Sequence, residues 1–324
     1  MAFKDKLAYL KNNRKLISRL IKNYVLILIK NKKRLRTVEL ALTYNCQCNC
    51  EHCYAKSIKK KRKKLSLKGL KKVIEDCVDL GAIHFLLTGG EPLLYEGFSD
   101  LCKFISSRGT ILTIATNALL LNKKRIKKIK EAGVDFIEIS LDYPDKRHDK
   151  FRNRAGCFEN AIKSLEICKE EGVLAGINAV VTNEKIIDGT ILDIIKLAKK
   201  MRVPMGLCFP TNNGGWLNKN VILNKENWKK ALALIKKHNI NICENNNYIK
   251  NGCFAGQEKI NVNIYGDVMP CPYIQMVYGN VFKEDLRNIY ENMSKDPSLN
   301  KFDNSFCLPA YNRKFIECYR KLKS

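Results

Sequence analysis

The chain has 324 residues, 45% of them hydrophobic, which suffices for one large domain and a smaller one. It carries 59 Lys and Arg against 32 Asp and Glu, a formal net charge of +27, together with 14 cysteines. The N-terminus shows no apolar run leading to a small-residue cleavage site, and the apolar run 24–29 is far shorter than the roughly 20 residues of a bilayer span. These features argue against a disulfide-stapled secreted protein, and they predict a cytoplasmic, reducing setting in which cysteines serve as metal ligands.

The positive charge is concentrated in two places. Residues 1–36 hold twelve Lys and Arg and one acid, Asp5, and residues 56–72 hold ten Lys and Arg and no acid. A solvated Lys-rich surface, a basic helix on an anionic membrane and a nucleic-acid contact are the three interpretations. Few aromatic residues interleave with the basic runs and no nucleic-acid motif is visible, so we do not expect nucleic acid as a partner.

From residue 37 onward, apolar strand patterns alternate with amphipathic helix patterns. Strands are expected at 37–43, 83–87, 111–115, 136–142, 174–182 and 205–209, and helices at 67–80, 97–108, 123–132, 157–171, 186–201 and 225–237. Strands separated by helices imply parallel βαβ units. The fold class expected is therefore α/β, an open partial (βα)6 TIM-like barrel with its site at the C-terminal ends of the strands.

The pattern changes after the Asn/Gly-rich stretch 210–224. Short strands, turns and spaced cysteines replace the βα repeat from about residue 240. We therefore expect three segments: a basic helical segment at 1–36, the barrel core at 37–224, and a small α+β iron–sulfur extension at 225–324.

Three cysteines follow the first expected strand directly. Cys46, Cys50 and Cys53 have the spacing C-x3-C-x2-C. Three thiolates from one loop leave the fourth iron of a cubic iron–sulfur cluster open for a small molecule. The competing interpretation is a zinc site with Cys48 as a fourth ligand. Zinc prefers a closed tetrahedron of ligands, and the single residue between Cys48 and Cys50 is a short spacing for two of them.

Further polar residues follow the next strands. Gly89-Gly90-Glu91-Pro92 comes after the second strand, where glycines permit close backbone approach and Glu91 offers a carboxylate to a ligand ammonium. The other candidates at strand ends are Asn117, Ser140, Asp142 and Arg152. Asn117 capping a turn and Arg152 as a surface charge are the alternatives for those two residues.

These motifs together resemble the radical S-adenosylmethionine (SAM) superfamily. The resemblance covers about residues 37–209 and implies that a 4Fe–4S cluster on Cys46, Cys50 and Cys53 reductively cleaves SAM, so that a hydrogen atom is taken from the substrate. It also implies that Gly89, Gly90, Glu91 and Pro92 hold the amine of SAM, that Asn117, Ser140 and Asp142 contact SAM, and that Arg152 binds its carboxylate. Relatives often have T-N-G where this chain has Thr116-Asn117-Ala118.

The C-terminal cysteines resemble the SPASM and twitch extensions of the same superfamily. The spacing from Cys253 through Gly266 to Cys271 is C-x12-G-x4-C, and Cys307 and Cys318 follow, whereas the dense cysteine run of a full SPASM domain is absent. The resemblance implies one auxiliary 4Fe–4S cluster on these four cysteines, with Cys243 in reserve. Burial of Cys307 and Cys318 as small hydrophobic residues is the alternative.

The leading functional hypothesis is a radical SAM enzyme that carries out an oxidation, either peptide or protein modification or alcohol dehydrogenation, with the auxiliary cluster as electron acceptor. Ferredoxin or flavodoxin is the expected electron donor. One alternative is a membrane-surface radical SAM enzyme, anchored by residues 1–36, that modifies a lipid or tetrapyrrole side chain. A remote alternative is a non-enzymatic iron–sulfur or zinc protein that binds nucleic acid.

Overall fold

The computed structural model describes residues 13–58, 62–242, 247–248, 252–300 and 307–321. Its described strands form one sheet in the order β10-β9-β8-β1-β2-β3-β4-β5-β6-β7. The strands are β1 (Thr37–Thr43), β2 (His84–Gly89), β3 (Ile111–Thr116), β4 (Phe136–Ser140), β5 (Ala175–Val180), β6 (Met205–Cys208), β7 (Asn241–Ile242), β8 (Lys259–Asn263), β9 (Asp267–Met269) and β10 (Gly279–Asn280).

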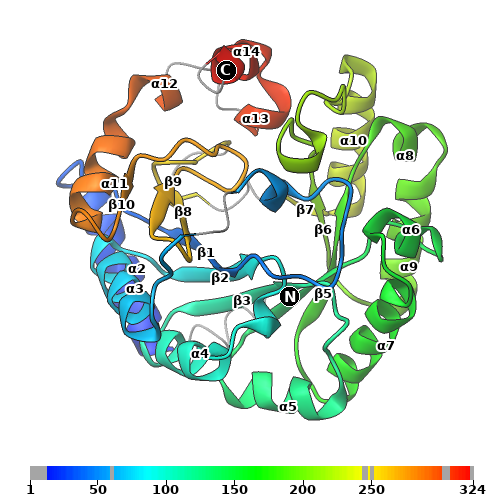
Figure 1. Ribbon diagram of the computed structural model, residues 1–324, viewed down its shortest axis with the longest axis horizontal. Helices are drawn as coiled ribbons and strands as arrows, with labels where there is room; N and C mark the ends of the chain where they lie inside the picture. Colours follow the sequence, from blue (N-terminus) through cyan, green and yellow to red (C-terminus); the bar gives the residue numbers. More distant parts are fainter. Residues whose placement is uncertain (1–12, 59–61, 243–246, 249–251, 301–306, 322–324) are drawn as a thin grey trace.

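Helices cover the outside of this curved sheet (Figure 1). Those of the barrel are α3 (Leu67–Leu80), α4 (Phe98–Ser107), α5 (Lys123–Glu131), α6 (Arg147–Arg152), α7 (Cys157–Glu170), α8 (Asn183–Ile187), α9 (Thr190–Met201) and α10 (Lys225–His238). The others are α2 (Arg14–Leu28) near the N-terminus and α11 (Leu286–Lys295), α12 (Pro297–Asn300), α13 (Leu308–Tyr311) and α14 (Arg313–Lys321) near the C-terminus. Short 3-10 helices lie at Tyr54–Ser57, Pro92–Leu94 and Gly214–Trp216.

The first six strands pair in chain order and all run parallel. The register aligns Leu40 of β1 with Leu87 of β2, and Leu87 with Ile114 of β3. These side chains are fully buried because helices pack against the outer face of the sheet. Since parallel strands end at the same edge, the loops that follow β1 to β6 gather at one end of the barrel.

The open partial barrel expected from the sequence is confirmed, and two details differ. The expected helix 186–201 is two helices, α8 and α9, because Gly189 between them adopts a φ of 79° that ends the first one. The extension also contributes to the barrel sheet, since β8 pairs parallel with β1 and β9 turns back antiparallel to β8.

The C-terminal helices connect the two ends of the open sheet. On α13, Tyr311 stacks on Trp228 of α10 with ring centroids 4.7 Å apart. On α14, the Tyr319 hydroxyl accepts a 2.5 Å hydrogen bond from the Gln275 N–H, in the loop that follows β9. Figure 1 shows both helices on the side where the sheet is open.

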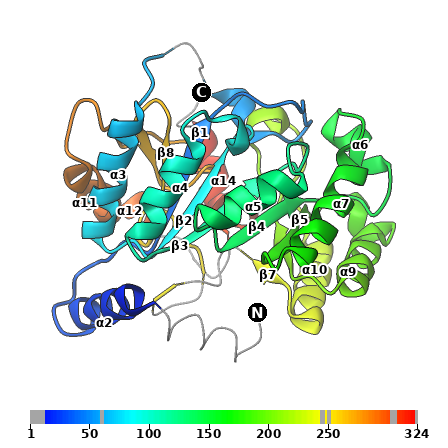
Figure 2. The same cartoon turned by 90° about the horizontal axis from the view of Figure 1, so that it is seen from below.

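Helix α2 lies outside the barrel, at the edge where the strands begin (Figure 2). Its Leu16 and Asn23 are buried seven residues apart, on one face of the helix. Arg19 donates to the carbonyls of Arg108 and Gly109, just before β3, and Asn23 donates to the Gly81 carbonyl, just before β2. Helix α2 is therefore attached to the end of the barrel opposite to the loops that follow the strands.

Candidate active site

The cysteine loop leaves the C-terminal end of β1 and crosses that end of the barrel. Cys46 is exposed, Cys50 is buried and Cys53 is half-buried. Cys48, which shares the loop, lies beside Cys157 at the start of α7, with the two sulfur atoms 3.6 Å apart. Cys48 therefore contacts Cys157 as well as the thiols of Cys46 and Cys50.

Hydrogen-bond donors from three segments point at the sulfur atoms of Cys46 and Cys50. The Cys48 N–H lies 3.4 Å and the Asn117 amide nitrogen 3.6 Å from the Cys46 sulfur, and an Arg152 guanidinium nitrogen lies 3.8 Å from the Cys50 sulfur. A hydrogen bond with the Cys48 thiol is the main cause that lowers the pKa of Cys46 to about 6 and that of Cys50 to about 7, against the effect of burial. Arg152 contributes electrostatically to both shifts. Cys46 and Cys50 therefore lose a proton, and reach the thiolate form that binds iron, more readily than an ordinary cysteine, whereas burial raises the pKa of Cys53.

The Gly89-Gly90-Glu91-Pro92 turn packs directly on the cysteine loop. A side chain on Gly90 would meet the Asn45 carbonyl oxygen at 2.3 Å, so only glycine fits there. The Gly90 N–H donates to the Thr43 carbonyl at 2.7 Å and the Glu91 N–H to the Asn45 carbonyl at 2.9 Å. This turn fixes the backbone from which Cys46 projects.

The Glu91 carboxylate is fully buried and joins three segments of the site. It accepts hydrogen bonds from the Leu93 N–H at 3.2 Å, the Thr116 hydroxyl at 2.8 Å and the Asn117 N–H at 2.9 Å. Burial raises its pKa to about 7. Three of its roughly four acceptor positions are thus used within the protein, and one is unused.

Asp142 and Arg152 form a buried ion pair. Arg152 donates to one Asp142 oxygen from Nε at 2.8 Å and from Nη2 at 2.5 Å, and the Val180 N–H donates to the other oxygen at 2.9 Å. Burial opposes the ionised form of Asp142, but the adjacent cations Arg152 and Lys185 outweigh it and hold the pKa of this carboxyl well below its usual range. The structure therefore uses Asp142 to orient Arg152 toward Cys50, whereas a direct contact of Asp142 with SAM remains a prediction.

Lys185 is a functional candidate that the sequence did not single out. It lies in the first turn of α8, just after β5, and is fully buried. Its ammonium lies 3.9 Å from Asp142 and donates to the Val180 carbonyl at 2.9 Å. Its ammonium sits over the rings of Tyr143 and Phe151, 4.4 and 4.3 Å from their centroids. Burial lowers its pKa to about 8. The position of Lys185 just after a barrel strand could have marked it as a candidate. It was not selected because the surrounding sequence has the pattern of an ordinary helix.

Gly214 and Gly215 also belong to the site, although the sequence identified them only as part of a loop. A side chain on Gly215 would meet the Glu51 carbonyl oxygen at 1.9 Å, and one on Gly214 would meet the Cys53 carbonyl oxygen at 2.1 Å. The Gly215 N–H donates to the Cys53 carbonyl at 3.1 Å. The loop that follows β6 therefore closes over the cysteine loop from the side opposite to Gly90.

Ser140 lies half-buried at the end of β4, and the barrel interior below it is polar. Asn178 donates to Glu138 at 3.2 Å, and Lys259 pairs with Glu39 at 2.5 Å. Burial raises the pKa of Glu138 to about 7. Side chains of the first, fourth, fifth and eighth strands thus line a polar interior beneath the cysteine loop.

The structure brings two of the four C-terminal cysteines, Cys253 and Cys271, near each other. Cys271 is buried, and Cys253 lies close enough to contribute to the raised pKa of Cys271. The buried Cys307 directly precedes α13. Cys318 is exposed on α14. Cys243, the reserve ligand, lies outside the described residues.

This extension meets the cysteine loop directly. Tyr54, next to Cys53, packs edge-on against Tyr273, two residues beyond Cys271, with centroids 5.9 Å apart. Gln275 donates to the Tyr54 carbonyl at 3.1 Å and accepts from the Ser57 hydroxyl at 2.6 Å. These contacts join the segment that follows Cys53 to the segment that follows Cys271.

The donor set fits a thiolate-ligated iron–sulfur cluster. Three thiols project from one short loop, two of them have lowered pKa values, and amide and guanidinium donors face their sulfur atoms. Such donors around sulfur tune a cluster held by thiolates.

Comparison with known proteins agrees with this assignment. The radical SAM superfamily model matches residues 40–198, and the SPASM iron–sulfur cluster-binding domain matches residues 253–312. SuiB of Streptococcus suis, solved with S-adenosylmethionine, superimposes with a TM-score of 0.69 over 94% of this chain and 78% of its own, at 16% identity, a likeness of fold. The chain belongs to the radical SAM superfamily and carries a SPASM-type extension. The cofactors are accordingly a SAM-binding 4Fe–4S cluster, SAM and auxiliary iron–sulfur. The matched SPASM region ends before Cys318.

Two curated relatives illustrate the range of the family. Fe-coproporphyrin III synthase of Methanosarcina barkeri is 31% identical over 207 residues, which is 63% of this chain and 49% of that protein. AdoMet-dependent heme synthase of the same organism is 26% identical over 289 residues, which is 79% of this chain and 82% of that protein. The chain thus spans about half of the first relative and most of the second.

Proposed function

We propose that this enzyme oxidises its substrate in two one-electron stages. The bound cluster and SAM supply a radical that removes a hydrogen atom from the substrate. The substrate radical would then pass one electron to the auxiliary cluster and release one proton to solvent, which gives a closed-shell product such as an alkene, a carbonyl or a cross-link. The observation that carries this proposal is the direct contact of Tyr54, which follows Cys53, with Tyr273 and Gln275, which follow Cys271.

The protein contributes orientation and charge to this chemistry. We propose that Arg152, held by Asp142, presents its remaining donor beside Cys50 and receives the SAM carboxylate, a task suited to guanidinium. The remaining acceptor position of Glu91 would receive the SAM ammonium, with Gly89, Gly90 and Pro92 providing the backbone of that turn. Asn117 and Ser140 project from the same edge of the barrel, where they would contact the rest of SAM.

Cys253, Cys271, Cys307 and Cys318 are proposed as ligands of one auxiliary 4Fe–4S cluster. Cys253 lies near Cys271, Cys307 is buried just before α13, and Cys318 is exposed on α14. Four thiolates complete one such cluster, so the proposal needs all four.

For the substrate we propose a tetrapyrrole, ahead of the peptide or alcohol favoured by the sequence. Two relatives of this chain support the choice, because they are named Fe-coproporphyrin III synthase and AdoMet-dependent heme synthase. The polar groups of the barrel interior, Glu138, Asn178 and Lys259, provide hydrogen-bonding partners for the polar substituents that such a molecule carries.

An anaerobic assay with SAM, a strong reductant and Fe-coproporphyrin III tests the substrate and the chemistry separately. We expect 5′-deoxyadenosine together with a mass change in the porphyrin. 5′-Deoxyadenosine without porphyrin change contradicts the substrate only, and absence of both from an iron-loaded protein contradicts the function.

The variant Cys271→Ala/Cys307→Ala tests the auxiliary cluster. Because these ligands lie outside the SAM loop, we expect SAM cleavage to persist and the oxidised product to be lost. Cys77→Ala/Cys102→Ala, which changes two buried cysteines in the barrel helices, is the matched control and should retain both. A soluble Cys271/Cys307 variant that forms full product would show that these cysteines do not carry the electron.

A further inference from the structure

Helix α2 presents an apolar face to solvent. Five of the thirteen large hydrophobic residues that are exposed in the described part of the chain fall within positions 21–29. Ile21, Leu28 and Ile29 are 60%, 68% and 76% exposed, and Tyr24 and Val25 complete the group. The remaining eight are scattered over the molecule, so this is a patch of the kind that marks a contact surface.

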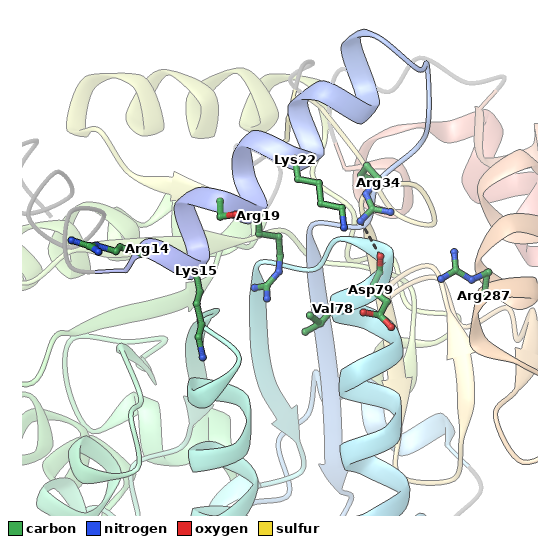
Figure 3. Close-up of a pocket in the computed structure, with 9 residues that line it drawn as sticks. Arg14, Lys15, Arg19, Lys22, Arg34, Val78, Asp79 and Arg287 are labelled. Atoms are coloured by element: carbon green, nitrogen blue, oxygen red, sulfur yellow. Dashed lines mark hydrogen bonds between the residues drawn. The ribbon is translucent and has the colours of Figure 1, made fainter.

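A basic groove runs beside this face. It has a volume of about 690 Å³ and is lined by Arg14, Lys15, Ser18, Arg19 and Lys22 of α2, by Arg34, Val78 and Asp79, and by Arg287 of α11. Six of these nine residues are cations and one is an acid, so the groove attracts anions. Figure 3 shows the side chains of Lys15, Arg19 and Lys22 reaching from α2 toward the end of the barrel.

Some of these cations hold α2 in place and others are available. Arg19 donates to two carbonyls before β3, and Arg34 donates to the Asp79 carbonyl at 2.9 Å. The side chains of Arg14 and Lys22 make no hydrogen bond or ion pair with another residue in the part of the chain that the structure describes. Their charges can therefore pair with groups from outside the protein.

The helix geometry places the cations between the core and the apolar face. At about 100° per residue, Leu16 and Asn23 define the buried face and Lys15 and Lys22 flank it. Ile21, Val25 and Leu28, at spacings of four and three, face away from the barrel. An outward apolar stripe with a basic flank is the arrangement of helices that lie in the plane of a membrane interface.

We propose that helix α2 docks this protein on an anionic lipid bilayer. Its apolar face enters the boundary between headgroups and acyl chains, and the basic groove receives lipid phosphates. Among the helices that the structure describes, none has the length and apolarity to cross a membrane, so the attachment is peripheral. Phosphate and an apolar layer must both be present in the partner, and an anionic bilayer offers both.

The docking surface and the active site lie at opposite ends of the barrel. Helix α2 bonds to the segments that precede β2 and β3, whereas the cysteine loop follows β1 at the far end of these parallel strands (Figure 2). The active site consequently faces away from the bilayer. Docking therefore localises the enzyme and leaves the site open on the far side, which disfavours a bilayer lipid as the substrate.

Co-sedimentation of the full chain with vesicles tests this proposal. We expect binding to vesicles of phosphatidylcholine with phosphatidylglycerol, weak binding to phosphatidylcholine alone, and release at high salt. Arg14→Gln/Lys22→Gln, which removes the two cations without a described partner, should reduce the partition coefficient by about 30-fold. The control Lys124→Gln/Lys128→Gln removes the same charge from exposed positions on α5 and should bind like the wild type.

The apolar face is tested separately. Leu28→Ser/Ile29→Ser should also lose binding, while Leu174→Ser/Ile187→Ser, which changes two exposed hydrophobic residues elsewhere, should keep it. Leu28→Trp should show a blue-shifted emission on anionic vesicles, and Ile187→Trp should not. SAM cleavage in solution should be unchanged in all of these variants.

Several results would overturn the proposal. Wild-type protein that ignores vesicle charge, or control pairs that lose binding as the α2 pairs do, would show that α2 is not the docking element. A protein that stays in the supernatant but dimerises through Leu28 and Ile29, or binds an RNA oligonucleotide through Arg14 and Lys22, would assign this face to another partner.

Discussion

Replacing Asp142 with Asn removes one charge from a fully buried site while keeping the shape of the side chain. The amide oxygen can still accept the Val180 N–H, but its NH2 group would meet the Arg152 donors that now bind the carboxylate. Arg152, which is 12% exposed, and Lys185, which is fully buried, would then lack their shared counter-charge.

The magnitude follows from these burials. Removing one partner of a buried ion pair costs about 3–5 kcal/mol of unfolding free energy, because the other charge is left without compensation. Lys185 can reduce this cost by releasing its proton, since burial already lowers its pKa to about 8. Arg152 cannot deprotonate. We therefore expect Asp142→Asn to cost about 3 kcal/mol, near the lower limit.

Urea unfolding of the anaerobically prepared protein, followed by circular dichroism, measures this cost as a midpoint shift of about 1 M. Asp145→Asn is the matched control, because its pair with Arg147 is about half exposed on each side and is worth below about 1 kcal/mol. Adding Lys185→Met to Asp142→Asn should recover part of the loss. Equal midpoints for the Asp142 and Asp145 variants would refute the assignment of Asp142 as the buried counter-charge.

Further predictions concern the cluster and SAM. Cys50→Ala should abolish SAM cleavage and remove about half of the iron, as two cubic clusters require, whereas an unchanged iron content by elemental analysis would argue against a cluster on this loop. Burial raises the pKa of Glu91 to about 7, so its carboxylate gains charge as the pH rises, and SAM affinity in anaerobic equilibrium dialysis should rise roughly five- to tenfold from about pH 6 to about pH 7.5. A SAM affinity that does not change with pH would show that Glu91 does not pair with the SAM ammonium. Gly215→Ala should lower iron retention because its new methyl group would meet the Glu51 carbonyl oxygen at 1.9 Å, while Gly206→Ala, whose nearest neighbour would be 3.5 Å away, should retain iron.

Both ends of the barrel bear on which substrate this enzyme can take. The interior beneath the cysteine loop is polar through Glu138, Asn178 and the Lys259–Glu39 pair. The proposed membrane surface lies at the other end, beside α2. A substrate that reaches the loops from solvent, such as a tetrapyrrole or a peptide, fits this geometry better than a lipid within the bilayer.

The sequence by itself determined the order of strands and helices and the end of the barrel where the chemistry lies. Strands alternating with amphipathic helices must pair in parallel, and the ends of parallel strands meet at one edge. Cys46, Glu91, Asn117 and Asp142 each follow a strand, so their meeting could be predicted from local pattern alone. The spacing C-x3-C-x2-C predicted the cluster in the same way, because its ligands lie within one loop.

Only the tertiary structure decided what these side chains contact. Glu91 bonds to Asn117, and Asp142 to Val180, across 26 and 38 residues, distances over which no periodicity carries information. The close approach of Gly215 to Glu51 and the pairing of β8 with β1 depend likewise on how separate segments pack. The basic, apolar pattern of α2 was visible in the sequence, but its place at the end opposite to the active site was decided by hydrogen bonds to carbonyls before β2 and β3. Local patterns specify elements, whereas the partners of a buried charge are set by the packing of elements that lie far apart in the chain.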